Sequence, residues 1–234
     1  MSFSLLLLGF LFGLRHALEA DHVAAVAYFA SRTTDIRQAA RHGAVWGMGH
    51  TLTLFLFGSV VLLVDGVVPT KFASALEFAV GVMLVGLGLD LLRRLWRDRV
   101  HFHTHRHGKN LPHFHAHSHA GEGEHDSSDH NHQHEMPRGA LYVGLLHGMA
   151  GSAALIILTL QTVTSVLEGV FYIALFGVGS IIGMAVLSVV IAVPLRYSSR
   201  SITGFYNTLQ TTLAVITLGI GVWMMVDQSQ VLFV

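Results

Sequence analysis

A short segment near the start of the chain carries five ionisable side chains within eight residues, although the sequence on either side is apolar. A charge at the middle of a bilayer costs roughly 2.5–3.5 kcal/mol on insertion scales, so such residues indicate a function. Imidazole and carboxylate groups held together in a low-dielectric interior suit borderline divalent ions such as nickel, cobalt and zinc. Cu(I) would prefer cysteine, which the chain lacks. The five residues are Arg15, His16, Glu19, Asp21 and His22.

Two more histidines in apolar segments complete the candidate site. His50 follows glycines that let helices approach closely, and His147 occupies in the second half of the chain the position of His16 in the first. Arg15 and Glu19 are four residues apart, so we expect them to form a buried ion pair that supports the site. The predicted metal ligands of the transport site are His16, Asp21, His22, His50 and His147.

The helix that carries the first group must be interrupted if its residues are to meet at one ion. In a straight helix that turns about 100° per residue, His16, Asp21 and His22 point near roughly 0°, 140° and 240°. Broken helices are tolerated at the midplane of a membrane where they line a cavity. We therefore predict an unwound segment between His16 and His22; the alternative is a straight helix whose ligands are completed from other helices.

Composition places the chain among membrane proteins. Of its 234 residues 52% are hydrophobic and only 12% are charged. Six apolar segments each reach the length of about 20 residues that a helix needs to cross the hydrocarbon core. The predicted fold is an all-α integral membrane protein with lipid as a partner and no role in nucleic-acid binding. The segments are Ser2–Ala30, His42–Val64, Phe72–Leu95, Arg138–Thr162, Leu167–Leu195 and Ile202–Val226.

The chain also repeats itself, in three blocks that keep their order. Each half holds three spans, and an odd number forces the second half into the opposite topology. We therefore predict two inverted three-helix repeats, 1–95 and 138–234, separated by a histidine-rich segment, 96–137. Inverted repeats build transporters that bind substrate near the midplane. The aligned blocks are Gly13–Ala20 with Gly144–Gly151, Trp46–His50 with Phe176–Ser180, and Leu76–Leu89 with Leu209–Val222.

Charge asymmetry orients the predicted spans. Of the 14 lysines and arginines, twelve fall in the loops on one side, Lys71 falls on the other, and Arg15 lies within the first span. Positive residues accumulate on the cytoplasmic side of membrane proteins. Both termini are therefore expected outside and the histidine-rich segment in the cytoplasm.

The histidine-rich segment is expected to bind metal without being part of the transport path. Interleaved Gly, Asp, Ser and Asn cannot bury a core, so we expect disorder in the absence of metal. Dense imidazole binds transition metals multivalently, which fits buffering or regulation. Its twelve histidines are His101, His103, His105, His107, His113, His115, His117, His119, His125, His130, His132 and His134.

The segment from Arg15 to His22 resembles the His-x4-Asp-His signature of the nickel/cobalt transporter family, which includes small transporters that accompany urease and hydrogenase. That family also has a Gly-His element in the following helix, like Gly49-His50. The resemblance implies passage of Ni²⁺ or Co²⁺, as substrate and without a prosthetic group, across a bacterial cytoplasmic membrane. His16, Asp21, His22 and His50 would be the selectivity and binding residues. The complete signature is typical of importers, so alternating-access uptake is expected, with nickel/cobalt efflux as the alternative.

Two other classes of protein fit the sequence less well. A membrane-anchored metallochaperone or sensor that acts through the histidine-rich segment would not need charges buried in the first span. A di-iron membrane enzyme needs tandem histidine boxes, and only five histidines lie outside the histidine-rich segment. The protein is therefore expected not to be an enzyme. A homo-oligomer and a link to nickel-enzyme maturation are further expectations.

Overall fold

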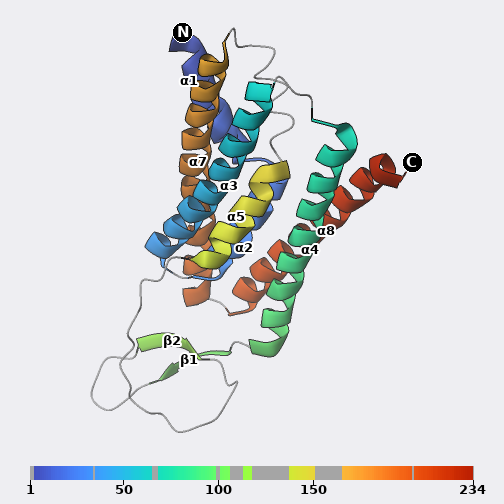
Figure 1. Ribbon diagram of the computed structural model, residues 1–234. Helices are drawn as coiled ribbons and strands as arrows, with labels where there is room; N and C mark the ends of the chain where they lie inside the picture. The colour runs from blue at the N-terminus through green and yellow to red at the C-terminus, as the bar shows by residue number, and fades with distance from the viewer. Residues whose placement is uncertain are drawn as a thin grey trace.

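The computed structural model describes residues 3–33, 35–64, 68–98, 101–105, 113–117, 137–150, 165–201 and 203–233, with only the backbone of 101–105 and 113–117. Figure 1 shows a helical bundle with a small hairpin at one end and the N-terminus at the other. The elements are α1 (Phe3–His16), α2 (Ala20–Ser31), α3 (Ile36–Val64), α4 (Thr70–Asp98), β1 (His101–His105), β2 (His113–His117), α5 (Arg138–Ala150), α7 (Val166–Ser201) and α8 (Thr203–Phe233).

The first apolar segment forms two helices rather than one. α1 ends at His16 and α2 begins at Ala20, so the predicted interruption between His16 and His22 is confirmed. Glu19 stands at the N-cap position of α2 with an extended backbone, φ −66° and ψ 148°. Asp21 in the first turn accepts a hydrogen bond from the backbone N–H of His22 at 2.9 Å, and a negative charge is favourable at a helix N-terminus.

Four helices, α3, α4, α7 and α8, are each long and apolar enough to cross a membrane. They match the predicted spans 42–64, 72–95, 167–195 and 202–226, and each extends beyond its predicted span at one or both ends. Most of these extensions are polar in sequence. A helix satisfies its backbone hydrogen bonds internally, so it can continue past the bilayer surface into polar sequence. Of the predicted span 138–162 the structure describes α5, and residues 151–164 lie outside the described residues.

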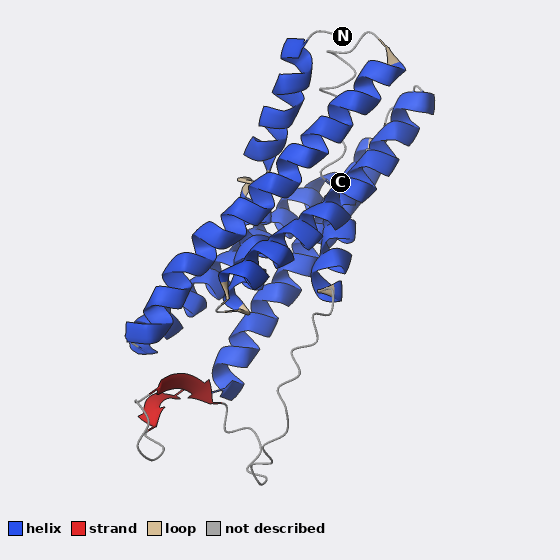
Figure 2. Cartoon of the chain, turned by 90° about the vertical axis from the view of Figure 1, so that its left-hand side faces the viewer, coloured by secondary structure: helices blue, strands red, loops and turns tan. Residues whose placement is uncertain are grey.

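Two long helix pairs organise the bundle. α3 packs against α7 and α4 against α8, whereas the short helices α1 and α5 pack on α7 and α3 respectively. Figure 2 shows the bundle from the side, built almost entirely of helices, with the hairpin at one end. One buried cluster, which includes Trp46, Leu84, Met184 and Ala214, joins α3, α4, α7 and α8.

Glycines allow the short helices to cross the long ones at close range. A Cβ atom added at Gly13 in α1 would lie 2.0 Å from the carbonyl oxygen of Phe176 in α7. A Cβ atom added at Gly144 in α5 would lie 2.1 Å from the carbonyl oxygen of Trp46 in α3. Only a residue without a side chain fits at these crossings, and small residues at helix crossings are typical of membrane bundles.

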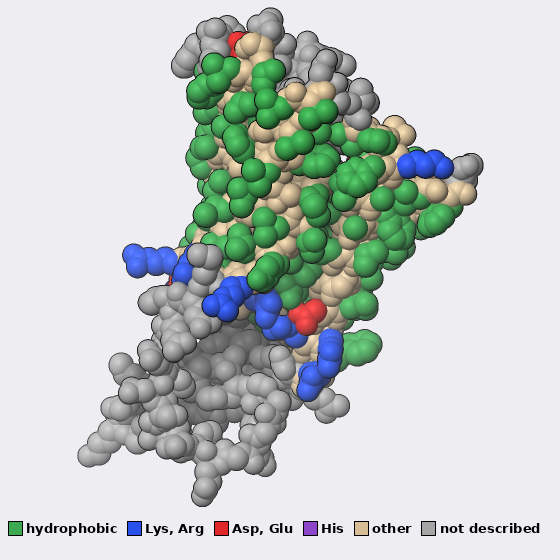
Figure 3. Space-filling model, viewed as in Figure 1, with side chains coloured by type: hydrophobic (Ala, Val, Ile, Leu, Met, Phe, Trp, Pro, Cys, Tyr) green, Lys and Arg blue, Asp and Glu red, His purple; other side chains and the backbone are tan. Residues whose placement is uncertain are grey.

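The outer surface of the bundle is apolar. Leu63, Val64 and Trp223 are 71%, 72% and 66% exposed, and many other large apolar side chains are similarly open. Figure 3 shows apolar side chains over the length of the bundle, with Lys and Arg gathered mainly toward the hairpin end. An apolar surface of this extent would be unfavourable in water and fits contact with lipid. The protein is a helical integral membrane protein.

The hairpin differs from the expectation of disorder for the histidine-rich segment. β1 and β2 pair antiparallel, with His101 opposite His117 and His105 opposite His113. Alternation of histidine with residues such as Phe102 has the period of a strand, and this pattern outweighs the polar composition in these two stretches. The rest of the segment, 106–112 and 118–136, lies outside the described residues.

Candidate metal site

The five predicted ligands come together from four helices. His16 is the last residue of α1, Asp21 and His22 stand in the first turn of α2, His50 lies inside α3, and His147 lies in α5. His22, His50 and His147 are at most 1% exposed, and His16 is 7% exposed. The interruption between α1 and α2 brings His16 and His22 close enough for their ring centroids to lie 4.1 Å apart.

Within the part of the chain that the structure describes, two groups of three residues have donor atoms spaced closely enough to hold a metal ion. The first, the histidine triad, consists of His16, His22 and His50, with donor atoms within 4.8 Å of one another. The Nε2 atoms of His16 and His50 are 3.2 Å apart, so one carries the proton and the other accepts it. The rings of His22 and His50 have centroids 5.0 Å apart.

The second group, the aspartate triad, consists of Asp21, His22 and His147. One carboxylate oxygen of Asp21 lies 2.8 Å from Nδ1 of His22, and the other lies 2.9 Å from Nε2 of His147. Each imidazole N–H donates to the carboxylate. This pairing fixes the tautomer and leaves the opposite ring nitrogen with a free lone pair, which is the usual arrangement behind metal-binding histidines. His22 belongs to both triads.

Three ring nitrogens of the cluster have no hydrogen-bond partner among the described residues. They are His22 Nε2, His50 Nδ1 and His147 Nδ1, and all three are fully buried. A buried polar atom without a partner costs about 1–3 kcal/mol, so several in one place require an explanation. Coordination of a cation would satisfy them.

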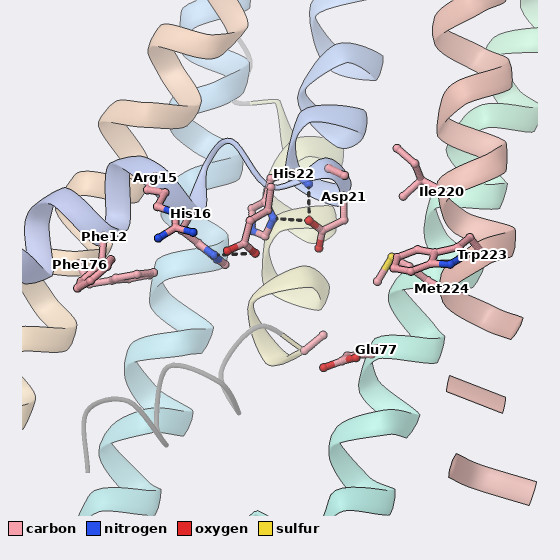
Figure 4. Close-up of a pocket in the computed structure, with 13 residues that line it drawn as sticks. Phe12, Arg15, His16, Asp21, His22, Glu77, Phe176, Ile220, Trp223 and Met224 are labelled. Carbon is pink, nitrogen blue, oxygen red and sulfur yellow. Dashed lines mark hydrogen bonds and ion pairs between the residues drawn. The ribbon is translucent and has the colours of Figure 1, made fainter. Parts of the chain in front are cut away.

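A cavity of about 520 Å³ reaches the cluster. Figure 4 shows His16, Asp21 and His22 on one side of it, with Glu77 of α4 and Trp223 and Met224 of α8 on the other. The cavity gives the buried ligands a route to the surroundings, and its lining includes several carboxylates that would attract a cation.

Arg15 and Glu19 are at this cavity but do not form the predicted buried ion pair. Arg15 is exposed, and the Glu19 side chain is 58% exposed. In the described part of the chain the Glu19 carboxylate contacts Nδ1 of His16 at 3.1 Å instead. The chain leaves helical geometry between Arg15 and Glu19, because α1 ends at His16 and α2 begins at Ala20, so the spacing of four residues no longer brings these two side chains together.

Sequence reasoning missed two residues of the site. Trp46 is fully buried, with its ring centroid 5.5 Å from that of His22 and 5.4 Å from that of His147. It precedes His50 by one helical turn, so helix periodicity was a usable signal. Glu77 lines the cavity, and a carboxylate inside the apolar segment 72–95 was a signal of the same kind as Asp21.

The loop histidines are separate from the buried site. Six of them lie in the hairpin strands, at the end of the bundle. The other six, His107, His119, His125, His130, His132 and His134, lie outside the described residues.

Comparison with known proteins identifies the family. The chain is 32% identical to the urease accessory protein UreH of Bacillus sp. strain TB-90 over 215 residues, which cover 88% of each chain. It is 22% identical over 185 residues, 77% of this chain and 72% of the relative, to a candidate nickel/cobalt efflux system of Methanocaldococcus jannaschii. No protein-family model and no solved structure matches the chain.

Similarity at this level over nearly the whole of both chains shows common ancestry, and neither relative is named as an enzyme. Two features of the chain agree with this ancestry: the helices that could cross a membrane and the His-x4-Asp-His segment. The protein belongs to the nickel/cobalt transporter family that includes the small urease-associated transporters.

Proposed function

We propose that the protein carries Ni²⁺ or Co²⁺ into the cell through a site formed by His16, Asp21, His22, His50 and His147. One observation carries the proposal: four buried imidazoles and one carboxylate from four helices converge in the interior of a membrane bundle. Neutral imidazole with carboxylate is the donor set that borderline divalent ions favour.

The two triads suggest distinct roles for the ligands. In this proposal the histidine triad holds the partly dehydrated ion through ring nitrogens, and Asp21 orients His22 and His147 from behind. His22 is common to both triads, so a small movement of the ion about His22 would transfer it toward His147. In this proposal Glu19 supports the site through its contact with His16, and Arg15 supports it from the wall of the cavity.

The proposed architecture is six spans in two inverted repeats, 1–95 and 138–234, joined by segment 96–137. Equivalent crossings support it. Gly13 meets Phe176, and Gly144, its counterpart in the second repeat, meets Trp46, the counterpart of Phe176. In the same way a Cβ atom at Gly88 would meet Ala214, and one at Gly221 would meet Gly81. Such pairs are expected from a two-fold axis in the membrane plane, and rocking of the repeats would give alternating access.

We further propose that the protein lies in a bacterial cytoplasmic membrane, with both termini outside and the hairpin in the cytoplasm. The gathering of Lys and Arg toward the hairpin end supports this orientation. Uptake is supported by the relative named as a urease accessory protein, and we propose that the imported nickel serves the maturation of a nickel enzyme. The second relative, named for efflux, keeps export as the alternative direction.

Radiolabelled nickel flux in right-side-out and inside-out vesicles tests substrate and direction together. We expect His50→Ala to abolish flux, whereas His42→Ala, in the same helix but outside both triads, should retain it. Equal flux in the two variants at equal protein level would refute the site. Accumulation restricted to inside-out vesicles would replace uptake with efflux.

A second experiment separates a carrier from a metallochaperone or sensor. Deletion of residues 101–134 removes the histidine-rich segment and leaves every residue of both triads. A carrier should keep moving nickel after this deletion, with altered affinity or regulation. Loss of all nickel-dependent activity would favour the chaperone instead.

A further inference from the structure

The hairpin brings six histidines to one face of a two-stranded ribbon. Successive residues of a strand alternate between the two faces of a sheet, so positions two apart share a face. The histidines of β1 are two apart, and so are those of β2. Residues directly opposite each other across a strand pair also share a face. The opposed pairs are His101 with His117, His103 with His115, and His105 with His113.

The register is decisive for this arrangement. A slip of one residue would move all the histidines of one strand to the other face. In the observed register the second face holds Phe102, Thr104, Phe114 and Ala116, none of which is a strong metal ligand. One face of the ribbon therefore consists only of histidine positions, arranged as three opposed pairs.

We propose that each opposed pair is a two-imidazole site for a borderline divalent ion, so that the face forms a ladder of metal sites. Opposed Cα atoms in an antiparallel pair are about 4.5–5.5 Å apart. Imidazole nitrogens bind such ions at about 2.0–2.1 Å, so two opposed histidines can share one ion. Consecutive pairs on one face are roughly 7 Å apart along the strands, which leaves room for an ion at each pair.

The ladder also accounts for order in a segment of disordered composition. An isolated two-stranded hairpin is at best marginally stable in water. An ion bound by both strands links them, and the free energy of metal binding then contributes to folding. The ladder stands apart from the site in the membrane, since β1 and β2 are at the end of the bundle and share no residue with either triad.

Nickel titration of the full-length protein in detergent, by equilibrium dialysis, tests the pairing. The variant His101→Ala/His117→Ala removes one opposed pair and leaves two intact. Its matched control, His101→Ala/His115→Ala, removes the same number of histidines but breaks two pairs. We expect the control to lose about twice as many tightly bound nickel ions, because a lone imidazole binds far more weakly than two joined ones.

Equal losses in the two variants, or no loss in either, would overturn the ladder. The comparison can be repeated with His103→Ala/His115→Ala against His103→Ala/His113→Ala, which must give the same ratio. Both members of each comparison are expected to keep nickel flux in vesicles. The flux of His50→Ala tests the membrane site alone, and the dialysis comparison tests the ladder alone. Either proposal can therefore fail without the other.

Discussion

At the scale of single residues, Asp21 has the central place in the candidate site. Each of its two oxygens accepts a hydrogen bond from an imidazole N–H. One donor is His22 beside it, and the other is His147 on another helix. The carboxylate therefore determines the tautomer of both rings and which ring nitrogens are free for a cation. An asparagine at this position would offer one acceptor, its oxygen, and one donor, its NH₂ group. The NH₂ group would face an imidazole N–H, and two donors cannot form a hydrogen bond with each other.

We predict that Asp21→Asn lowers nickel affinity by about 10–100-fold, the usual effect of removing a carboxylate behind a metal-binding histidine. Isothermal titration of protein lacking residues 101–134 would measure it without the loop histidines. Asp90→Asn is the control, because that carboxylate pairs with Tyr28 and Arg94 and belongs to neither triad. Unchanged affinity in the Asp21 variant would contradict the role given to it.

Proton competition gives a second prediction at this scale. Metal-binding imidazoles must be neutral, so binding releases any protons they hold and affinity falls as pH is lowered. We expect the nickel affinity of the protein lacking residues 101–134 to decrease steadily between about pH 8 and pH 5. Titrations in buffers of different ionisation enthalpy would report the released protons. Affinity that does not vary over this range would contradict competition between protons and nickel for these rings.

Most of these residues could be predicted, for a physical reason. A charge inside an apolar segment is costly, so His16, Asp21 and His22 stand out against their neighbours. Their partners are harder to predict. The contact between Asp21 and His147 depends on how closely α5 approaches the rest of the bundle, and no local pattern encodes that distance. Trp46 carries no charge that would mark it, and the signal it offered was its position one helical turn before His50.

At the scale of helices, close crossings hold the ligands in position. α5 carries His147, and its Gly144 lies against the backbone of α3 one turn before His50. This crossing places the two histidines with ring centroids 5.7 Å apart. The interruption between α1 and α2 was predictable because His16, Asp21 and His22 point in different directions on a straight helix and could not meet at one ion there. The hairpin was not, because its strand periodicity lies within a composition typical of disorder.

We predict that Gly144→Ala destabilises the protein by about 1–3 kcal/mol or more, since its methyl group would overlap the Trp46 carbonyl. Gly139→Ala, in the same helix, has nothing within 4 Å of the added atom and should be neutral or stabilising by about 1 kcal/mol. Thermal unfolding in detergent compares the two. Equal melting temperatures would show that the crossing is looser than described.

At the scale of the whole molecule, the orientation of the protein in the membrane determines which end of the bundle faces the cytoplasm. The chain has no cysteine, so a single introduced thiol reports its own side of the membrane without background. Lys71 lies in the first turn of α4 and Arg97 in its last turn, so the two mark opposite ends of one helix.

We predict that a membrane-impermeant maleimide applied to intact cells labels Lys71→Cys but not Arg97→Cys. Permeabilised cells should give labelling of both variants, which controls for accessibility. The reverse pattern in intact cells would place the hairpin outside and invert the proposed orientation.

The presence of His22 in both triads has a consequence for stoichiometry. An ion that engages this ring in one triad deprives the other of its shared ligand, so the two positions are mutually exclusive. A second ion cannot push the first forward, as happens in a multi-ion pore. Each cycle would then carry one ion, and flux should saturate with concentration as it does for a carrier with single occupancy.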